Sequence, residues 1–125
     1  MNVEETPEKL EDDVVVIHVI TDKATPQQLQ QMLETLETYI KLAVDVRQRI
    51  VAGGGALHAE CETALLQEGS RQEYIWGADW IPESQEVRFE SLINIRPRQG
   101  NRSMTITKSA LRTTIEAIVR ERLQR

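Results

Sequence analysis

One histidine with several carboxylates close to it in the sequence is the feature best suited to chemistry. His58 lies four residues before Glu62, so the two side chains share one face of a helix. An imidazole can act as a general base when a carboxylate such as Asp45, Glu60 or Glu62 orients it. We take His58, Asp45 and Glu60 as the candidate catalytic residues. The commoner alternative is a structural histidine that bonds to a helix end or a backbone carbonyl.

A metal site is a second use of the same segment. His58 and Glu62 could bind a metal together with Cys61 or Asp45. The chain has only two histidines and lacks the zinc-protease helix pattern, so we predict no metal site. Cys61 falls on the apolar stripe of the predicted helix and has no CxxC partner. A buried thiol is inert, so we do not predict a cysteine nucleophile.

Three consecutive glycines, residues 53–55, come just before this predicted helix. Bare backbone N–H groups at a helix start attract anions, so Gly54 and Gly55 are candidate anion-binding residues. The spacing matches neither the P-loop nor the dinucleotide-binding fingerprint. The commoner alternative is a tight turn that requires a positive φ angle.

The segment 96–102 carries three arginines in seven residues. A guanidinium group can bind a phosphate or a carboxylate through two parallel hydrogen bonds, so Arg96 and Arg102 join Asn94 as candidate anion-binding residues. RNA binding would also require aromatic side chains that stack on bases. The chain has only two Trp, two Tyr and one Phe, which disfavours a nucleic-acid partner.

Hydrophobic periodicity predicts the elements that must position these residues. Strands are predicted at residues 14–20, 39–47, 74–81 and 86–95, with a short additional strand at 104–107. Helices are predicted to begin at Pro26 and at Ala56, and a last helix is predicted with Ser109 as its N-terminal cap. A continuous helix over residues 26–49 is the alternative to the strand at 39–47. The predicted fold is α+β, with two layers and a mainly antiparallel sheet backed by helices, in the order β-α-β-α-β-β-(β)-α.

Alternation along the predicted strands sorts the side chains onto two sheet faces. The apolar face must be covered by the first and last helices. The opposite face gathers the polar side chains of Asp45, Arg47, Glu90, Asn94 and Arg96. These residues would form a polar cleft with His58 if its helix packs at the edge of this face. The commoner alternative is a solvated outer face.

The composition indicates a single globular domain. The chain has 125 residues and a net charge of −5, which argues against a protein that coats nucleic-acid duplexes. We expect residues 1–13 to be an acidic, loosely ordered leader and residues 14–125 to form the domain. A single cysteine fits a reducing compartment, and we find neither a signal peptide nor an apolar run long enough for a membrane. We therefore expect a cytoplasmic protein with no membrane partner.

Several segments together resemble an uncharacterised prokaryotic family of small domains of unknown function. The resemblance is carried by residues 44–46 (VDV), 51–60 (VAGGGALHAE), 76–77 (WG), 93–97 (INIRP) and 101–103 (NRS). It implies a stand-alone cytoplasmic protein, and it brings no known activity, cofactor or catalytic residue. This chain has Ala56 where the family is expected to have Glu, and Glu60 where Asp is usual. These departures shift any acid–base role toward Glu60, Glu62 or Asp45, or toward no catalysis.

The residues support three functional hypotheses, of which the first is a binding or assembly domain without catalysis. Such a domain would form a homo-oligomer, with Trp76, Trp80 and Phe89 supplying interface area if they are not in the core. The second is a small hydrolase or lyase-like enzyme that uses His58 with Asp45 and holds a small anionic ligand with Arg96. The third is a nucleotide or RNA binder through the loop at 96–102. The sequence identifies no cofactor.

Overall fold

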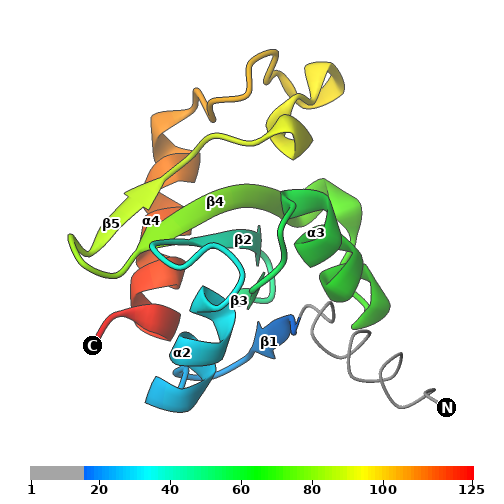
Figure 1. Ribbon diagram of the computed structural model, residues 1–125. Coiled ribbons are helices and arrows are strands. Elements are labelled where there is room, and N and C mark those ends of the chain that lie inside the picture. The colour runs from blue at the N-terminus through cyan, green and yellow to red at the C-terminus, as the bar shows by residue number, and fades with distance from the viewer. Residues whose placement is uncertain (1–15) are drawn as a thin grey trace, which may run out of the picture.

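A computed structural model describes residues 16–125 of the chain (Figure 1). The predicted leader at 1–13 lies outside the described residues, as does the beginning of the strand predicted at 14–20. The elements in chain order are β1 (His18–Ile20), α2 (Pro26–Leu33), β2 (Ile40–Asp45), β3 (Ile50–Gly53), α3 (His58–Gln67), β4 (Ile75–Ile81), β5 (Glu86–Arg88) and α4 (Ser109–Leu123). Short 3-10 helices occupy Gln72–Tyr74, Leu92–Asn94 and Pro97–Gln99.

The described strands form one antiparallel sheet in the order β1-β3-β2-β4-β5. The central pairing joins β2 to β4, with Ile40 opposite Trp80 at one end and Asp45 opposite Ile75 at the other. The predicted α+β class with an antiparallel sheet is therefore confirmed. The strand predicted at 39–47 is also confirmed, and the alternative of a continuous helix is wrong.

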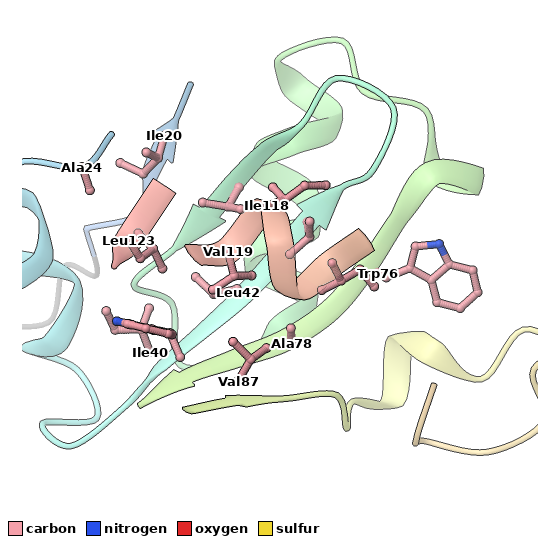
Figure 2. Close-up of a cluster of buried hydrophobic side chains, with 14 of the residues drawn as sticks. Ile20, Ala24, Ile40, Leu42, Trp76, Ala78, Val87, Ile118, Val119 and Leu123 are labelled. Carbon is pink, nitrogen blue, oxygen red and sulfur yellow. The ribbon is translucent and has the colours of Figure 1, made fainter. Parts of the chain in front are cut away.

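One face of the sheet packs against α2 and α4 (Figure 2). Leu42, Val44 and Val51 contribute to this core, and α4 adds Ile115, Ile118, Val119 and Leu123. Both tryptophans belong to it, since Trp76 is 5% exposed and Trp80 is 1% exposed. Phe89 packs against the same cluster. These aromatic residues were expected to supply an oligomer interface only if they lay outside the core, and that condition is not met.

The other face of the sheet packs against α3. Ala43 of β2 and Ala52 of β3 point to this side and meet Cys61 and Leu65 of the helix. Alanine side chains are short, so they let a helix axis approach a sheet closely. The described chain thus has helices on both sheet faces: α2 and α4 cover one, and α3 covers the face on which polar side chains were predicted.

The strand β3 was not predicted. Its run of Ile50, Val51 and Ala52 directly precedes the glycines, which were interpreted as a break in the chain. A tight connection, in which Arg49 adopts φ 60°, follows β2 and brings β3 beside it. The observed order is therefore β-α-β-β-α-β-β-α.

The strand predicted at 86–95 ends early, at Arg88, because a side chain takes its place. The amide of Asn94 accepts from the N–H of Gly77 at 2.8 Å and donates to the carbonyl of Gly77 at 3.0 Å. These two groups of β4 therefore need no neighbouring strand. The short strand predicted at 104–107 is reduced to a single bridge between Glu90 and Thr105. The segment after β5 arches away from the sheet (Figure 1).

None of the helices in residues 16–125 is both long enough and apolar enough to cross a membrane.

Candidate functional site

His58 is paired with an aspartate that the sequence interpretation did not include. The Nε2 atom of His58 lies 2.8 Å from Oδ1 of Asp79 and 3.1 Å from the carbonyl oxygen of Ala78. The two side chains are 11% and 14% exposed. Asp79 comes from the middle of β4, a rigid element, so the carboxylate holds the imidazole ring in one orientation.

Glu60 fixes the position of His58 from within α3. Its Oε1 atom accepts hydrogen bonds from the backbone N–H groups of Ala56 at 2.9 Å and Leu57 at 3.1 Å. This is the carboxylate half of a capping box, and it satisfies N–H groups that a helix start leaves without partners. Glu60 therefore defines where α3 begins, with His58 as its first residue.

The glycines before α3 are explained by close packing. Gly54 has φ 113°, and a Cβ atom there would lie 2.3 Å from the carbonyl oxygen of Val16. A Cβ atom on Gly55 would lie 3.0 Å from Oε1 of Glu60. Both glycines are buried, and the carbonyl of Gly54 accepts a hydrogen bond from Thr35. These contacts correspond to the tight-turn alternative; the anion-binding role of Gly54 and Gly55 stays a prediction.

Lys41 lies beside this pair. In the register of β2 and β4 it stands opposite Asp79, so both side chains leave the sheet on the side of α3. Its Nζ atom donates to the carbonyl of Ala56 at 3.1 Å and so ties β2 to the turn before α3. Positive and negative side chains thus flank His58 on the same face of the sheet.

These residues line a pocket with a volume of about 420 Å³. One wall is the beginning of α3, with Leu57, and the opposite wall is the segment that follows β5, with Leu92. The complete lining consists of Lys41, Leu57, His58, Ala59, Asp79, Glu90, Ser91, Leu92, Ile93 and Met104. Half of these ten residues are apolar and half are polar or charged, but most of the surface that the pocket exposes is apolar.

Asp45 is not in this pocket. It lies at the end of β2, where its Oδ1 atom accepts from the N–H groups of Arg47 at 2.9 Å and Gln48 at 3.0 Å. Its other oxygen accepts from the hydroxyl of Ser70. The carboxylate is 1% exposed and closes the connection between β2 and β3. It lines a separate hollow together with Tyr74, so the structure does not bring Asp45 to His58.

Asn94 and Arg96 hold the far wall in place. Besides Gly77, the amide of Asn94 donates to the carbonyls of Phe89 at 3.3 Å and Met104 at 3.2 Å. Arg96 donates to the carbonyls of Gln72, Ile75 and Ile93 at 2.8–3.0 Å. The side chains of Asn94 and Arg96 are thus occupied by contacts within the fold, and neither lines the pocket around His58.

Arg96 also forms an ion pair with Glu62, at 3.2 Å between Nη2 and Oε2. Both side chains are 12% exposed, and the guanidinium lies 5.1 Å from the ring centre of Trp76. Burial lowers the pKa of Arg96 from its ordinary value, and the Glu62 carboxylate opposes this shift. The carboxylate that was predicted to share a helix face with His58 is therefore paired with the arginine.

The remainder of the loop at 96–102 is organised by Asn101. Its amide donates to the carbonyls of Asn94, Ser103 and Thr105 at 2.8–3.0 Å. Arg98 and Arg102 are exposed. The loop therefore presents two of its three arginines to solvent, and the anion-binding role of Arg102 stays a prediction.

Cys61 lies on the side of α3 that faces the sheet. Its thiol is fully buried and is 3.4 Å from the carbonyl of Lys41. Burial raises the pKa of the Cys61 thiol from 9.0 to about 11, mainly because a thiolate would lose its hydration. A neutral thiol in this position is a poor nucleophile.

Within residues 16–125, no cluster of three or more histidine, cysteine or acidic side chains is arranged to hold a metal ion. The pair of His58 and Asp79 has two such side chains, whereas a structural or catalytic zinc site uses at least three protein ligands.

Asp79 and Lys41 are the site residues that sequence reasoning missed. Both had a detectable signal, since each is a charged residue inside a run that otherwise reads as a buried strand. Asp79 also lies on the opposite strand face from its neighbours Ala78 and Trp80. Their meeting with His58 depends on the register of β2 against β4, which one sequence does not specify.

The described residues thus define an α+β domain in which a histidine–aspartate pair lies at a largely apolar pocket. The family described as "Protein of unknown function (DUF5674)" matches residues 18–122 of the chain. The chain belongs to this family, which confirms the resemblance to a family of unknown function. No curated protein and no solved structure matches the chain significantly.

Proposed function

We propose that this chain is a binding domain for a small molecule, with the pocket around His58 as its site. The observation that carries the proposal is a group of exposed apolar side chains around a hollow. Leu57, Leu92 and Met104 are 57%, 71% and 44% exposed, and all three line the pocket. A ligand that covers them recovers about 25 cal/mol for each Å² of apolar surface removed from water. Such pockets typically measure roughly 300–1,000 Å³.

A binding role is favoured over catalysis by the positions of the other predicted catalytic residues. Asp45 and Glu60 both use their carboxylates to accept backbone N–H groups. Neither lines the pocket, so His58 is the one predicted catalytic residue there. A few polar groups beside a mostly apolar surface suffice to orient a ligand, so a binding role needs no further catalytic residue.

A thermal-shift screen of small molecules with three proteins tests this proposal. The parent is compared with Leu92→Asp, which places a charge in the pocket wall. The matched control is Leu66→Asp, because Leu66 is an exposed apolar residue of α3 that does not line the pocket. We expect ligands that raise the melting temperature of the parent and of Leu66→Asp but not of Leu92→Asp. Ligands that stabilise all three proteins equally would contradict the assignment of the site.

A second candidate function is acid–base catalysis, and the 2.8 Å contact between His58 and Asp79 favours it. In this function His58 is the base and Asp79, in place of Asp45, is its orienting carboxylate. The two candidates differ in the fate of the ligand. Mass spectrometry of a bound compound after long incubation with an equal amount of protein separates them. Unchanged compound counts against catalysis, whereas conversion that is lost in His58→Gln counts for it.

The assembly form of the proposal is that a second copy of the chain covers the same apolar side chains. Analytical ultracentrifugation over a wide concentration range tests it. A dimer that forms in the parent and is lost in Leu92→Asp supports self-association, and a strict monomer contradicts it. We also propose a cytoplasmic location, which the single, buried cysteine supports.

A further inference from the structure

The hydrogen-bond partners of His58 determine which ring nitrogen carries the proton. Nε2 faces Oδ1 of Asp79 at 2.8 Å and the carbonyl oxygen of Ala78 at 3.1 Å. A carbonyl oxygen only accepts hydrogen bonds, and so does an ionised carboxylate. Nε2 must therefore be the protonated nitrogen, because a bare Nε2 would place its lone pair against two acceptors.

In the neutral ring the other nitrogen, Nδ1, then carries a lone pair. Among the hydrogen bonds of residues 16–125, none involves Nδ1 of His58, whereas the ring itself lines the pocket. A hydrogen-bond acceptor in the lining of a mostly apolar pocket restricts which ligands can bind, because covering it without a donor is costly. A ligand that displaces water from this nitrogen must bring a hydrogen-bond donor of its own.

The charges around the pocket disfavour an ionic ligand. Lys41 is positive and Glu90 is negative, and both contribute to the lining. The carboxylate of Asp79 is engaged by His58. An anionic ligand would meet two carboxylates against one ammonium group, a cationic ligand would meet Lys41, and either would lose its own hydration in the apolar part of the pocket.

We propose that the pocket binds neutral molecules that carry a hydroxyl group on an apolar body, with Nδ1 of His58 as the acceptor of the hydroxyl hydrogen. The apolar body lies against Leu57, Leu92 and Met104. This inference rests on the proposed function, because it names the class of ligand for the same pocket.

The first test concerns the protonation state of the ring and needs no ligand. The chain has only two histidines, so a long-range ¹H–¹⁵N spectrum of imidazole-labelled protein is simple to assign, with His58→Gln identifying the signals. The expected result is a ring of His58 with its proton on Nε2 and a bare Nδ1. A proton on Nδ1 would overturn the inference whatever the pocket binds.

The second test uses thymol and its methyl ether, in which a methyl group replaces the hydroxyl hydrogen and removes the donor. Binding is followed by the shift of the Nδ1 resonance and by titration calorimetry. We expect the parent to bind thymol about fivefold more tightly than the ether, the effect of one hydrogen bond. This preference should disappear in His58→Phe and persist in the matched control His18→Phe, since the ring of His18 contacts Gln31 outside the pocket.

The outcomes separate the inference from the proposed function. Equal binding of thymol and its ether to the parent, or a preference that survives in His58→Phe, overturns the hydroxyl inference and leaves the pocket as a binding site. If neither probe binds, or if Leu92→Asp binds thymol as well as the parent does, the proposed site falls, and the inference falls with it. If His58→Phe does not fold, a proton on Nδ1 of the parent or equal binding of the two probes to the parent still overturns the inference.

Discussion

Asn94 takes the place of a strand at the edge of β4, and its buried amide uses both its oxygen and its nitrogen. We predict that Asn94→Asp lowers the free energy of unfolding by about 3 kcal/mol or more. The reason is that the new carboxylate, in place of the NH₂ group, would face the carbonyl oxygens of Gly77, Phe89 and Met104. Urea unfolding at neutral pH measures the change.

The control for this substitution is Gln67→Glu, which converts an exposed amide of α3 to an acid. Its effect should stay within about 0.5 kcal/mol. A loss below about 1 kcal/mol in Asn94→Asp would show that the amide hydrogens contribute little to holding the far wall of the pocket.

The Cys61 thiol makes a prediction about alkaline pH. Its pKa is about 11 in the folded chain, against 9.0 for an exposed thiol. Between these two values the unfolded chain loses the thiol proton while the folded chain keeps it. Stability from this group is complete below pH 9 and falls by about 1.4 kcal/mol per pH unit until the folded thiol also ionises.

Urea unfolding of the parent and of Cys61→Ala, at about pH 8 and at steps up to about pH 11, isolates this contribution. Lysine and tyrosine titrate in both proteins, so the difference between the two curves belongs to the thiol. We expect the parent to lose stability more steeply than the variant above pH 9. Parallel curves would contradict the assignment of Cys61 as a buried, neutral thiol.

Among the elements, β4 allows the segment that carries the far wall of the pocket to pack closely, because Gly77 has no side chain. A Cβ atom on Gly77 would lie 2.6 Å from Cβ of Ser91 and 2.7 Å from its hydroxyl oxygen. We predict that Gly77→Ala displaces the segment that carries Leu92 and costs about 1–3 kcal/mol, the usual cost of overpacking. Ligands of the parent should bind the variant more weakly. Thermal unfolding and ligand titration of the same sample measure both effects.

A double-mutant cycle distinguishes this clash from a general effect of the substitution. Ser91→Gly removes Cβ and the hydroxyl oxygen of Ser91, the two atoms closest to the new methyl group. The double variant should therefore lose less stability than the two single variants predict by addition. Strict additivity would show that the close approach of the segment to β4 is not what Gly77 provides.

The elements themselves were largely predictable from the sequence. The alternation from Ile40 to Val46 identified β2, and helical spacing identified α2, α3 and α4. The failures occurred where side chains replace backbone pairing. Asn94 satisfies Gly77, so residues after Arg88 keep an alternating pattern without forming a strand. The short strand β3 was hidden because its last residue is one of the glycines interpreted as a break.

On the scale of the whole molecule, the sequence drew attention to His58, which lines the pocket, but not to its partner Asp79. A helix start rich in glycines and carboxylates identified the histidine. Asp79 reaches it through the pairing of β2 with β4 and the packing of α3 on that face, which are both long-range contacts. Asp45 and Arg96 looked equally suitable in the sequence, but both bond to groups of the fold and neither lines the pocket around His58.

Arg96 connects parts of the chain that lie far apart in sequence, and it makes the last prediction. It ties the loop after β5 to Glu62 of α3 and to the carbonyl of Ile75 in β4. We predict that Arg96→Leu lowers the free energy of unfolding by about 3–5 kcal/mol, because a largely buried Glu62 loses its partner. The exposed Arg98 gives the matched control, Arg98→Leu, which should change stability by less than about 0.5 kcal/mol.

The manner of unfolding shows whether this link acts on the whole molecule. In a Trp80→Phe background the remaining tryptophan, Trp76, against which Arg96 packs, reports on the loop side, and far-ultraviolet circular dichroism reports on all the helices. If Arg96 holds the loop and α3 in one cooperative unit, the two signals of Arg96→Leu shift together to lower urea concentration. Glu62→Gln combined with Arg96→Leu should then recover part of the loss, since it removes the unpaired charge. A tryptophan transition that precedes the dichroism transition would show that the pocket wall unfolds separately from the domain.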